Sequence, residues 1–188
     1  MAAVVEMSTE PTSTTLMPVS TIGHSTHPID EFIAMLQAHS IAELVDIRTI
    51  PRSRHNPQFN RDSLPASLDA AGIAYLHMPA LGGLRRARPD SVNTGWRNAS
   101  FRGYADYMQT EDFKAALEEL IGLAREKRVA IMCAEAVEWR CHRSLVADAL
   151  EVRGVPVQHI QTATRAKRHR MTPFAQVHGT EIVYREKA

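Results

Sequence analysis

Short apolar runs alternate with amphipathic helical patterns along most of the chain, and this alternation limits its fold more than any other feature. Strands are predicted at residues 19–22, 41–47, 73–78, 129–133 and 155–160. Helices are predicted after Pro28, at residues 63–71, 101–108 and 111–127, and from the residues after Cys141 up to Gly154. Strands that alternate with helices are joined by right-handed crossovers, which favour a parallel sheet. We therefore expect an α/β protein with a three-layer Rossmann-like fold, in which helices flank a mostly parallel central sheet of about five strands.

One domain accounts for this pattern. A chain of 188 residues with 44% hydrophobic residues can bury a substantial core. Residues 1–17 are rich in Ser, Thr and Pro without a period, which is typical of a disordered leader. Residues 18–188 are expected to form the single α/β domain. Its last part, residues 161–188, is predicted to be a basic extension with a basic run at 165–170 and a weak strand near 181–184.

The chain shows no secretory or lipidation signal and no apolar segment of membrane-spanning length. It has only two cysteines, Cys133 and Cys141. A pair of cysteines without an export signal is typical of a reducing compartment. We therefore expect a cytoplasmic protein with free thiols and no membrane partner.

The loops that follow the predicted strands are rich in arginine, although the net charge is only +1. The arginines in these loops are Arg48, Arg52, Arg54, Arg85, Arg86, Arg88, Arg140 and Arg143. The outgoing loops of a parallel sheet share one edge, and biased codon usage would instead scatter arginine evenly. Their position therefore favours an anionic ligand, which the adjacent Gly82 and Gly83 would allow to approach the backbone closely.

Both cysteines lie in one strand, loop and helix unit. Cys133 ends the apolar strand, and Cys141 stands at the start of the next helix with His142 and two arginines beside it. A helix N-terminus and positive neighbours lower the pKa of a thiol, so Cys141 is the candidate nucleophile. Burial as a small apolar side chain is the alternative for Cys141, and Cys133 is expected to form a wall of the pocket.

Other strand ends carry further candidate groups. His24 and Ser25 would form a base and hydroxyl pair with Asp46 orienting the imidazole, or His24 would brace its loop. Glu135 would act as a general acid or base, or would hold the loop as an arginine partner. The residues alone leave both alternatives open.

Several of these residues form recognisable short motifs. The motifs are Thr21-Ile-Gly-His-Ser25, Asp46-Ile-Arg48 with Pro51 and Ser53, Leu81-Gly-Gly83, Gly103-Tyr104, Cys133-Ala-Glu135 and Cys141-His-Arg143. Together, over residues 21–160, they resemble the bacterial and archaeal family called domain of unknown function 488. Ile47 is a conservative departure from the family's usual Asp-Val-Arg triplet. The resemblance implies a fold of the kind expected above and brings no activity, substrate or catalytic residue.

The leading hypothesis for function is an enzyme, a hydrolase or transferase that acts on a phosphate-bearing or nucleotide-like anion at the carboxyl edge of the sheet. The candidate catalytic residues are Cys141, His24, Glu135 and His142. The candidate substrate-binding residues are Ser25, Arg48, Arg52, Arg54, Gly82, Gly83, Tyr104 and Arg143. Six residues separate Cys133 from Arg140, whereas the phosphatase signature requires five, so phosphatase chemistry is disfavoured.

Two further hypotheses come from other classes. The first is a nucleic-acid-binding module without turnover, which would use the same arginines and the run at 165–170. The second is a redox or metal-dependent protein, in which any metal would be bound by Cys133, Cys141, His142 and His24, although their spacing is poor for a metal site. The sequence requires no cofactor and leaves the oligomeric state open.

Overall fold

The structure is a computed structural model that describes residues 17–186, so nearly all of the expected leader lies outside the described residues. A sheet of six strands forms its centre, in the order β3-β2-β4-β1-β5-β6, and a separate hairpin pairs β7 with β8. The strands are β1 (Val19–Gly23), β2 (Glu43–Asp46), β3 (Ala74–His77), β4 (Val129–Cys133), β5 (Val157–Thr162), β6 (Arg165–Arg168), β7 (Ala175–His178) and β8 (Glu181–Tyr184). Strands β1 to β5 are all parallel, and β6 runs antiparallel to β5.

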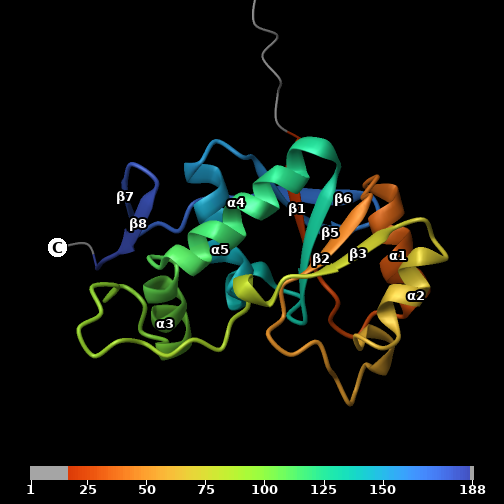
Figure 1. Ribbon diagram of the computed structural model, residues 1–188, viewed down its shortest axis with the longest axis horizontal. Coiled ribbons are helices and arrows are strands. Elements are labelled where there is room, and N and C mark those ends of the chain that lie inside the picture. The colour runs from red at the N-terminus through yellow and green to blue at the C-terminus, as the bar shows by residue number, and fades with distance from the viewer. Residues whose placement is uncertain (1–16, 187–188) are drawn as a thin grey trace, which may run out of the picture.

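Helices cover both faces of this sheet (Figure 1). They are α1 (Ile29–Ala38), α2 (Leu64–Asp69), α3 (Ala99–Tyr107), α4 (Glu111–Glu126) and α5 (Arg143–Val152), with short 3-10 helices at Pro57–Phe59, Pro79–Leu81 and Glu138–Arg140. One core contains α1 and α2 with side chains from one face of the sheet, and a larger core contains α3, α4 and α5 with side chains from the other face. The expected three-layer α/β fold with a mostly parallel sheet is confirmed.

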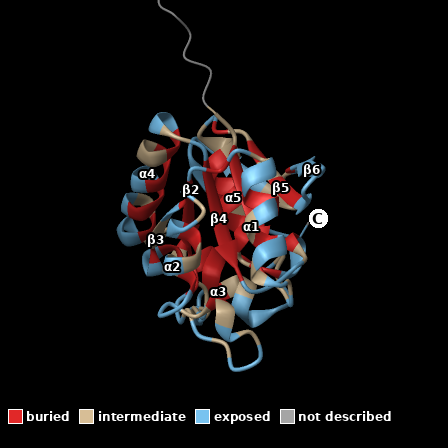
Figure 2. Ribbon diagram, turned by 90° about the vertical axis from the view of Figure 1, so that its right-hand side faces the viewer, coloured by how far each residue is buried: buried red, intermediate tan, exposed pale blue. Residues whose placement is uncertain are grey.

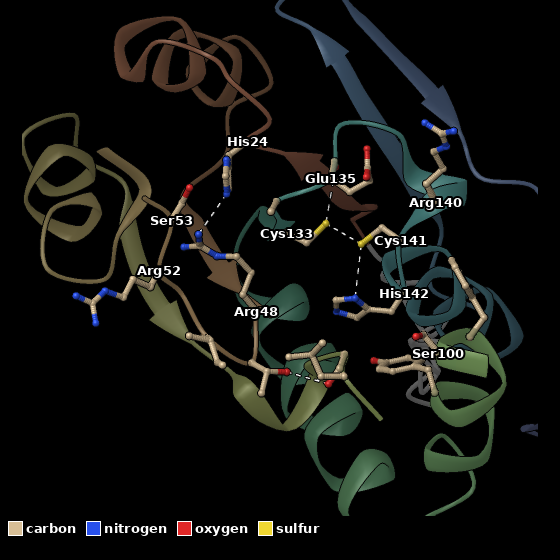
Figure 3. A pocket seen from close by; sticks show the side chains of 17 residues that line it. His24, Arg48, Arg52, Ser53, Ser100, Cys133, Glu135, Arg140, Cys141 and His142 are labelled. Carbon is tan, nitrogen blue, oxygen red and sulfur yellow. Dashed lines mark hydrogen bonds between the residues drawn. The ribbon is translucent and has the colours of Figure 1, made fainter. Parts of the chain in front are cut away.

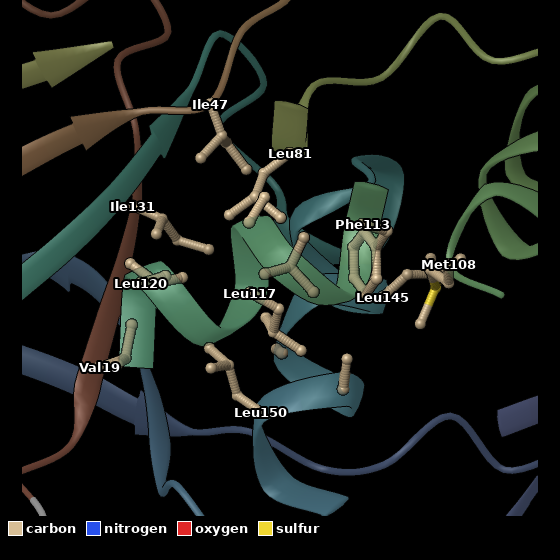
Figure 4. Packing of buried hydrophobic residues seen from close by; sticks show 14 of the residues in the cluster. Val19, Ile47, Leu81, Met108, Phe113, Leu117, Leu120, Ile131, Leu145 and Leu150 are labelled. Atoms are coloured by element: carbon tan, nitrogen blue, oxygen red, sulfur yellow. The ribbon is translucent and has the colours of Figure 1, made fainter. Parts of the chain in front are cut away.

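The pattern of buried side chains explains why these segments form strands and helices. The strands β1, β2 and β4 are buried along their whole length, as expected for parallel strands covered on both faces (Figure 2). On α4 and α5, apolar residues such as Leu117, Leu120 and Leu145 pack together against Ile131 of β4 (Figure 4). Thr110 caps the N-terminus of α4 by accepting a hydrogen bond from the backbone N–H of Phe113. Among the described residues, no helix is long and apolar enough to cross a membrane.

The C-terminal part of the chain is integrated into the domain more fully than the sequence indicated. The basic run at 165–170 supplies β6, an exposed edge strand whose charged side chains discourage pairing with other chains. The hairpin of β7 and β8 inserts Ile182 and Tyr184 into the larger core. The Tyr184 hydroxyl donates to Oδ2 of Asp148 on α5 at 2.9 Å. Residues after β5 therefore complete the core that supports α5.

We expect Ile182→Ala to lower the free energy of unfolding by about 2–4 kcal/mol, because it leaves a cavity in the larger core. Val177→Ala in the same hairpin is the matched control. Val177 is 47% exposed, so its change should stay within about 0.5 kcal/mol. Urea unfolding of the two variants measures both values, and equal small effects would mean that the hairpin does not support the core.

Candidate functional site

A pocket of about 420 Å³ opens at the carboxyl ends of the parallel strands. Its wall comes from the loops after β1, β2, β3 and β4 and from α3, as Figure 3 shows. The lining residues are His24, Arg48, Thr49, Ile50, Arg52, Ser53, Gly83, Leu84, Ser100, Phe101, Tyr104, Cys133, Ala134, Glu135, Arg140, Cys141 and His142. Pockets of this size hold small-molecule ligands, and the carboxyl edge of a parallel sheet is where such ligands bind.

The two cysteines meet in this pocket. Their Sγ atoms lie 2.7 Å apart, and both are free thiols. Cys133 is 3% exposed and Cys141 is 7% exposed, so a substrate reaches the sulfurs only through the pocket. The close approach depends on Gly23 at the end of β1, where a side chain would collide with the carbonyl of Glu135 in the loop between the cysteines.

The two thiols have opposite protonation preferences. Burial acts to raise the pKa of Cys141, but hydrogen bonds from Cys133 and His142, together with the charge of Arg143, hold that pKa well below its ordinary value. Burial and the hydrogen bond with Cys141 raise the pKa of Cys133 well above its ordinary value. These directions make Cys141 the sulfur that ionises first and Cys133 the sulfur that keeps its proton. Sγ of Cys141 also lies 3.6 Å from Nδ1 of His142 and 3.5 Å from the backbone N–H of Arg143.

Arg143 supplies the positive charge under this pair. Its side chain is 1% exposed, and its Nε donates to Sγ of Cys133 at 2.9 Å. Its Nη2 donates to the carbonyl of Glu135, which fixes the loop between the cysteines. A buried cation is stable only when it is paired and its donors are satisfied. The guanidinium therefore stabilises negative charge on the sulfurs and positions their loop.

The remaining donor of Arg143 begins a buried chain of hydrogen bonds. Its Nη1 donates to Oγ1 of Thr21 at 3.2 Å, and Thr21 contacts Nδ1 of His159 at 2.7 Å. Nε2 of His159 lies 2.9 Å from Nδ1 of His169, whose Nε2 lies 2.8 Å from Asp148. Arginine can only donate and the carboxylate of Asp148 can only accept, so the chain joins a donor at one end to an acceptor at the other. Burial lowers the pKa of His159 to about 4.

Sequence reasoning did not identify the members of this chain beyond Thr21. His159 sits in a predicted strand, and His169 lies in the basic run of the predicted C-terminal extension. The alternation of buried positions in β5 was the available signal, because it places His159 inside the sheet beside Thr21 of β1.

A second buried ion pair shapes the other side of the pocket. Arg48 donates through Nε and Nη2 to the carboxylate of Asp46, at 2.8 Å and 2.6 Å. Its Nη1 lies 3.2 Å from Nε2 of His24, whose Nδ1 lies 2.9 Å from the carbonyl of Ser25. Burial, aided by the charge of Arg48, lowers the pKa of His24 to about 4. Asp46 thus acts on His24 only through Arg48, and the geometry favours a His24 that braces its loop over one that acts as a base.

His142 is the titratable side chain best placed to touch a ligand. Its ring lies 5.0 Å from that of Tyr104, and Gly83 packs against its Nδ1 edge. Within the described part of the chain, Nε2 of His142 has no hydrogen-bond partner. The Tyr104 hydroxyl donates to the carbonyl of Leu81 at 2.7 Å, so Tyr104 contributes its ring to the wall. The rings of His142 and Tyr104 therefore form one side of the pocket wall.

The structure brings most of the candidate residues to one pocket and leaves a few outside its wall. His24, Arg48, Arg52, Gly83, Tyr104, Cys133, Glu135, Cys141 and His142 line it. Arg143 lies beneath the sulfurs, with its side-chain donors directed to protein groups. Ser25, Arg54 and Gly82 are not part of the lining, and Gly82 packs against Thr49 of the neighbouring loop.

The histidines and cysteines do not form a metal site. Among residues 17–186, no group of three or more His, Cys, Asp or Glu side chains is arranged to hold a metal ion. Nε2 of His24 faces Arg48, and Cys133 and Cys141 face each other and Arg143. The set Cys133, Cys141, His142 and His24 is therefore not arranged around a common ion position.

Comparison with known proteins identifies the family. The family model described as Domain of unknown function DUF488 matches residues 28–150, about two thirds of the chain. The chain belongs to this family. The matched stretch of the DUF488 domain includes Arg48, Glu135 and both cysteines, and it ends within α5. The search of curated proteins and the search of solved structures gave no match.

The lowered pKa values of His24 and His159 predict that this DUF488 protein loses stability in acid. Each pKa falls from 6.5 to about 4 on folding, so between these values the unfolded chain binds more protons. The stability is fully present above pH 6.5 and is lost as the pH falls towards 4, by up to about 3 kcal/mol for each histidine. Urea unfolding at pH 7 and at pH 4.5 measures this loss of stability. His159→Gln should make the free energy of unfolding less dependent on pH. His178→Gln, at an exposed position, is the control and should leave the pH dependence unchanged. Equal pH dependence in the two variants would contradict the lowered pKa of His159.

Replacing Arg143 should suppress the Cys141 thiolate. We expect Arg143→Met to lower the alkylation rate of Cys141 at pH 7 by roughly ten-fold or more, since one pKa unit is about 1.4 kcal/mol and a buried charge at 4 Å contributes several. Arg143→Lys keeps a charge and should retain part of the rate. Arg153→Met, at the far end of α5, is the control and should react like the wild type. Unchanged reactivity in folded Arg143→Met would contradict the role of the guanidinium.

Proposed function

We propose that this protein is a cysteine-dependent enzyme, a transferase or hydrolase in which the Cys141 thiolate attacks a small anionic substrate in the pocket. The observation that carries the proposal is the pair of sulfurs, 2.7 Å apart, above the buried guanidinium of Arg143. The thiolate is the nucleophilic form of cysteine, and activation by positive charge and neighbouring donors is how enzymes prepare it. A merely structural buried cysteine would be protonated and inert.

The pocket supports a substrate with both apolar and charged parts. Ile50 and Leu84 line it, although their side chains are 65% and 79% exposed, and Phe101 and Tyr104 add aromatic surface. Arg52 and Arg140 lie on opposite sides of the cysteine pair, with their guanidinium groups turned outward in Figure 3. Exposed arginines around an entrance attract anions at long range. A phosphate-bearing or nucleotide-like molecule of small size fits this combination.

His142 and Glu135 would handle the protons of the reaction. Both residues line the pocket, and Nδ1 of His142 lies 3.6 Å from Sγ of Cys141. After attack by Cys141, His142 would donate to the leaving group, and Glu135 would accept a proton from an incoming water or acceptor. Arg48 and His24 would keep the opposite wall rigid, because they bind to each other and to Asp46.

The first test is the reactivity of each cysteine. We expect iodoacetamide to label Cys141 with an apparent pKa well below the ordinary value of about 8.5, and to label Cys133 only in strong alkali or after unfolding. Alkylation across pH followed by peptide mass spectrometry measures both. Faster labelling of Cys133 at neutral pH, or labelling of Cys141 only above about 8.5, would overturn the assignment of the nucleophile.

The second test concerns the charge of the substrate. Iodoacetate carries one negative charge and iodoacetamide carries none. The rate of alkylation of Cys141 by iodoacetate, divided by the rate with iodoacetamide, therefore reports the local electrostatic potential. We expect Arg52→Gln and Arg140→Gln to lower this ratio several-fold at low salt, since each removes a charge from the pocket entrance. Arg54→Gln is the control, because Arg54 is exposed outside the lining. A ratio that none of the variants changes would contradict anion attraction by these arginines.

A further inference from the structure

We propose that this site reduces small disulfides by thiol–disulfide exchange, with Cys141 as the attacking residue and Cys133 as the resolving residue. The proposal rests on the proposed function for its nucleophile and assigns that nucleophile a further reaction, in which the second cysteine has a role. Its basis is the Sγ to Sγ distance of 2.7 Å inside a pocket that both sulfurs line. A hydrolase with a single nucleophile has no use for a second thiol in this position.

In the first step, the Cys141 thiolate attacks one sulfur of a disulfide RSSR. The bond between Cys141 and that sulfur forms, the substrate S–S bond breaks, and RS⁻ leaves with the electron pair. The negative charge thus leaves Cys141, which is now a neutral mixed disulfide. The ring of His142 lines the pocket next to Cys141, so it borders the space through which the thiolate departs.

The second step follows from the position of Arg143. Its Nε donates directly to Sγ of Cys133 at 2.9 Å. Before the first step, the neighbouring thiolate opposes ionisation of Cys133, but after it the guanidinium has only Cys133 to stabilise. Cys133 therefore gives its proton to the pocket water, and its thiolate attacks Sγ of Cys141. The second RS⁻ leaves, and the Cys133–Cys141 disulfide forms.

The full exchange is balanced. Two electrons pass from the cysteine pair to RSSR, which becomes two thiolates, and the protein becomes the disulfide. A small dithiol returns the protein to its starting state by the reverse exchange and is itself oxidised to a cyclic disulfide. The apolar wall with arginines around the entrance favours a compact disulfide that carries acidic groups.

The proposal is tested with dithiobis(nitrobenzoate), an aromatic disulfide whose two halves each carry a carboxylate and leave as coloured thiolates. The folded, reduced full chain should release about two thiolates per chain without retaining an adduct, and the peptide map should show Cys133 joined to Cys141. Cys133→Ser should release about one thiolate and keep the nitrobenzoate group on Cys141. Cys141→Ser should release its first thiolate at least roughly ten-fold more slowly, because Cys133 is the protonated and deeper thiol.

The contrary outcomes distinguish failure of the exchange proposal from failure of the proposed function. If wild type keeps the adduct on Cys141 while Cys141 still alkylates as a thiolate, the exchange proposal is wrong and the proposed function stands. If Cys141→Ser reacts as fast as wild type, the nucleophile itself is wrong. Equilibration of wild type in mixtures of reduced and oxidised dithiothreitol, followed by alkylation of the remaining thiols, gives a second readout that needs no variant. A pair that stays fully reduced in the most oxidising mixture would also overturn the proposal.

Discussion

The buried guanidinium of Arg143 is the interaction on which the rest of the site depends. A buried cation is costly unless negative charge and acceptors surround it, and removal of one member of such a set costs about 3–5 kcal/mol. Here the set consists of the sulfurs, the carbonyl of Glu135 and the chain from Thr21 through two histidines to Asp148. One end of this network holds the reactive sulfurs, and the other end is held by the C-terminal hairpin through Tyr184. The fold and the chemistry are therefore coupled through a single side chain.

The parallel sheet explains how residues far apart in sequence come to share this network. Strands β4, β1 and β5 are neighbours, so Cys133, Thr21 and His159 lie in adjacent strands and Arg143 reaches them from the start of α5. Gly23 permits the loop between the cysteines to pack directly on the end of β1. On the opposite side of the pocket, Arg48 and Asp46 form a separate buried salt bridge. The cysteine pair thus lies between the hydrogen-bond network of Arg143 and the ion pair of Arg48 with Asp46, and it lines the pocket.

Much of this arrangement could be predicted from the sequence, because hydrophobic periodicity and turn residues determine the order of strands and helices. The same logic places the strand-ending motifs at one edge, including both cysteines. The sequence could not reveal the hydrogen-bond partner of each arginine. It predicted that Arg48 and Arg143 both bind an anion, whereas Arg48 donates to Asp46 and Arg143 donates to the sulfur of Cys133. It also missed the chain through His159 and His169, since the alternation along β5 gives no partner for His159 and a histidine in a basic run carries no sign of its burial. Partner choice depends on three-dimensional contacts between distant segments, which no local pattern records.

The central claim is that the cysteine pair holds one negative charge at neutral pH. Thiolates absorb in the ultraviolet, whereas thiols do not, so a pH titration of the reduced protein counts them directly, with the double variant Cys133→Ser, Cys141→Ser as the blank. We expect one thiolate to be present already near neutral pH, and a second to form only well above the ordinary cysteine pKa of about 8.5. Two cysteines that ionise together near that value, with none ionised at pH 7, would contradict it.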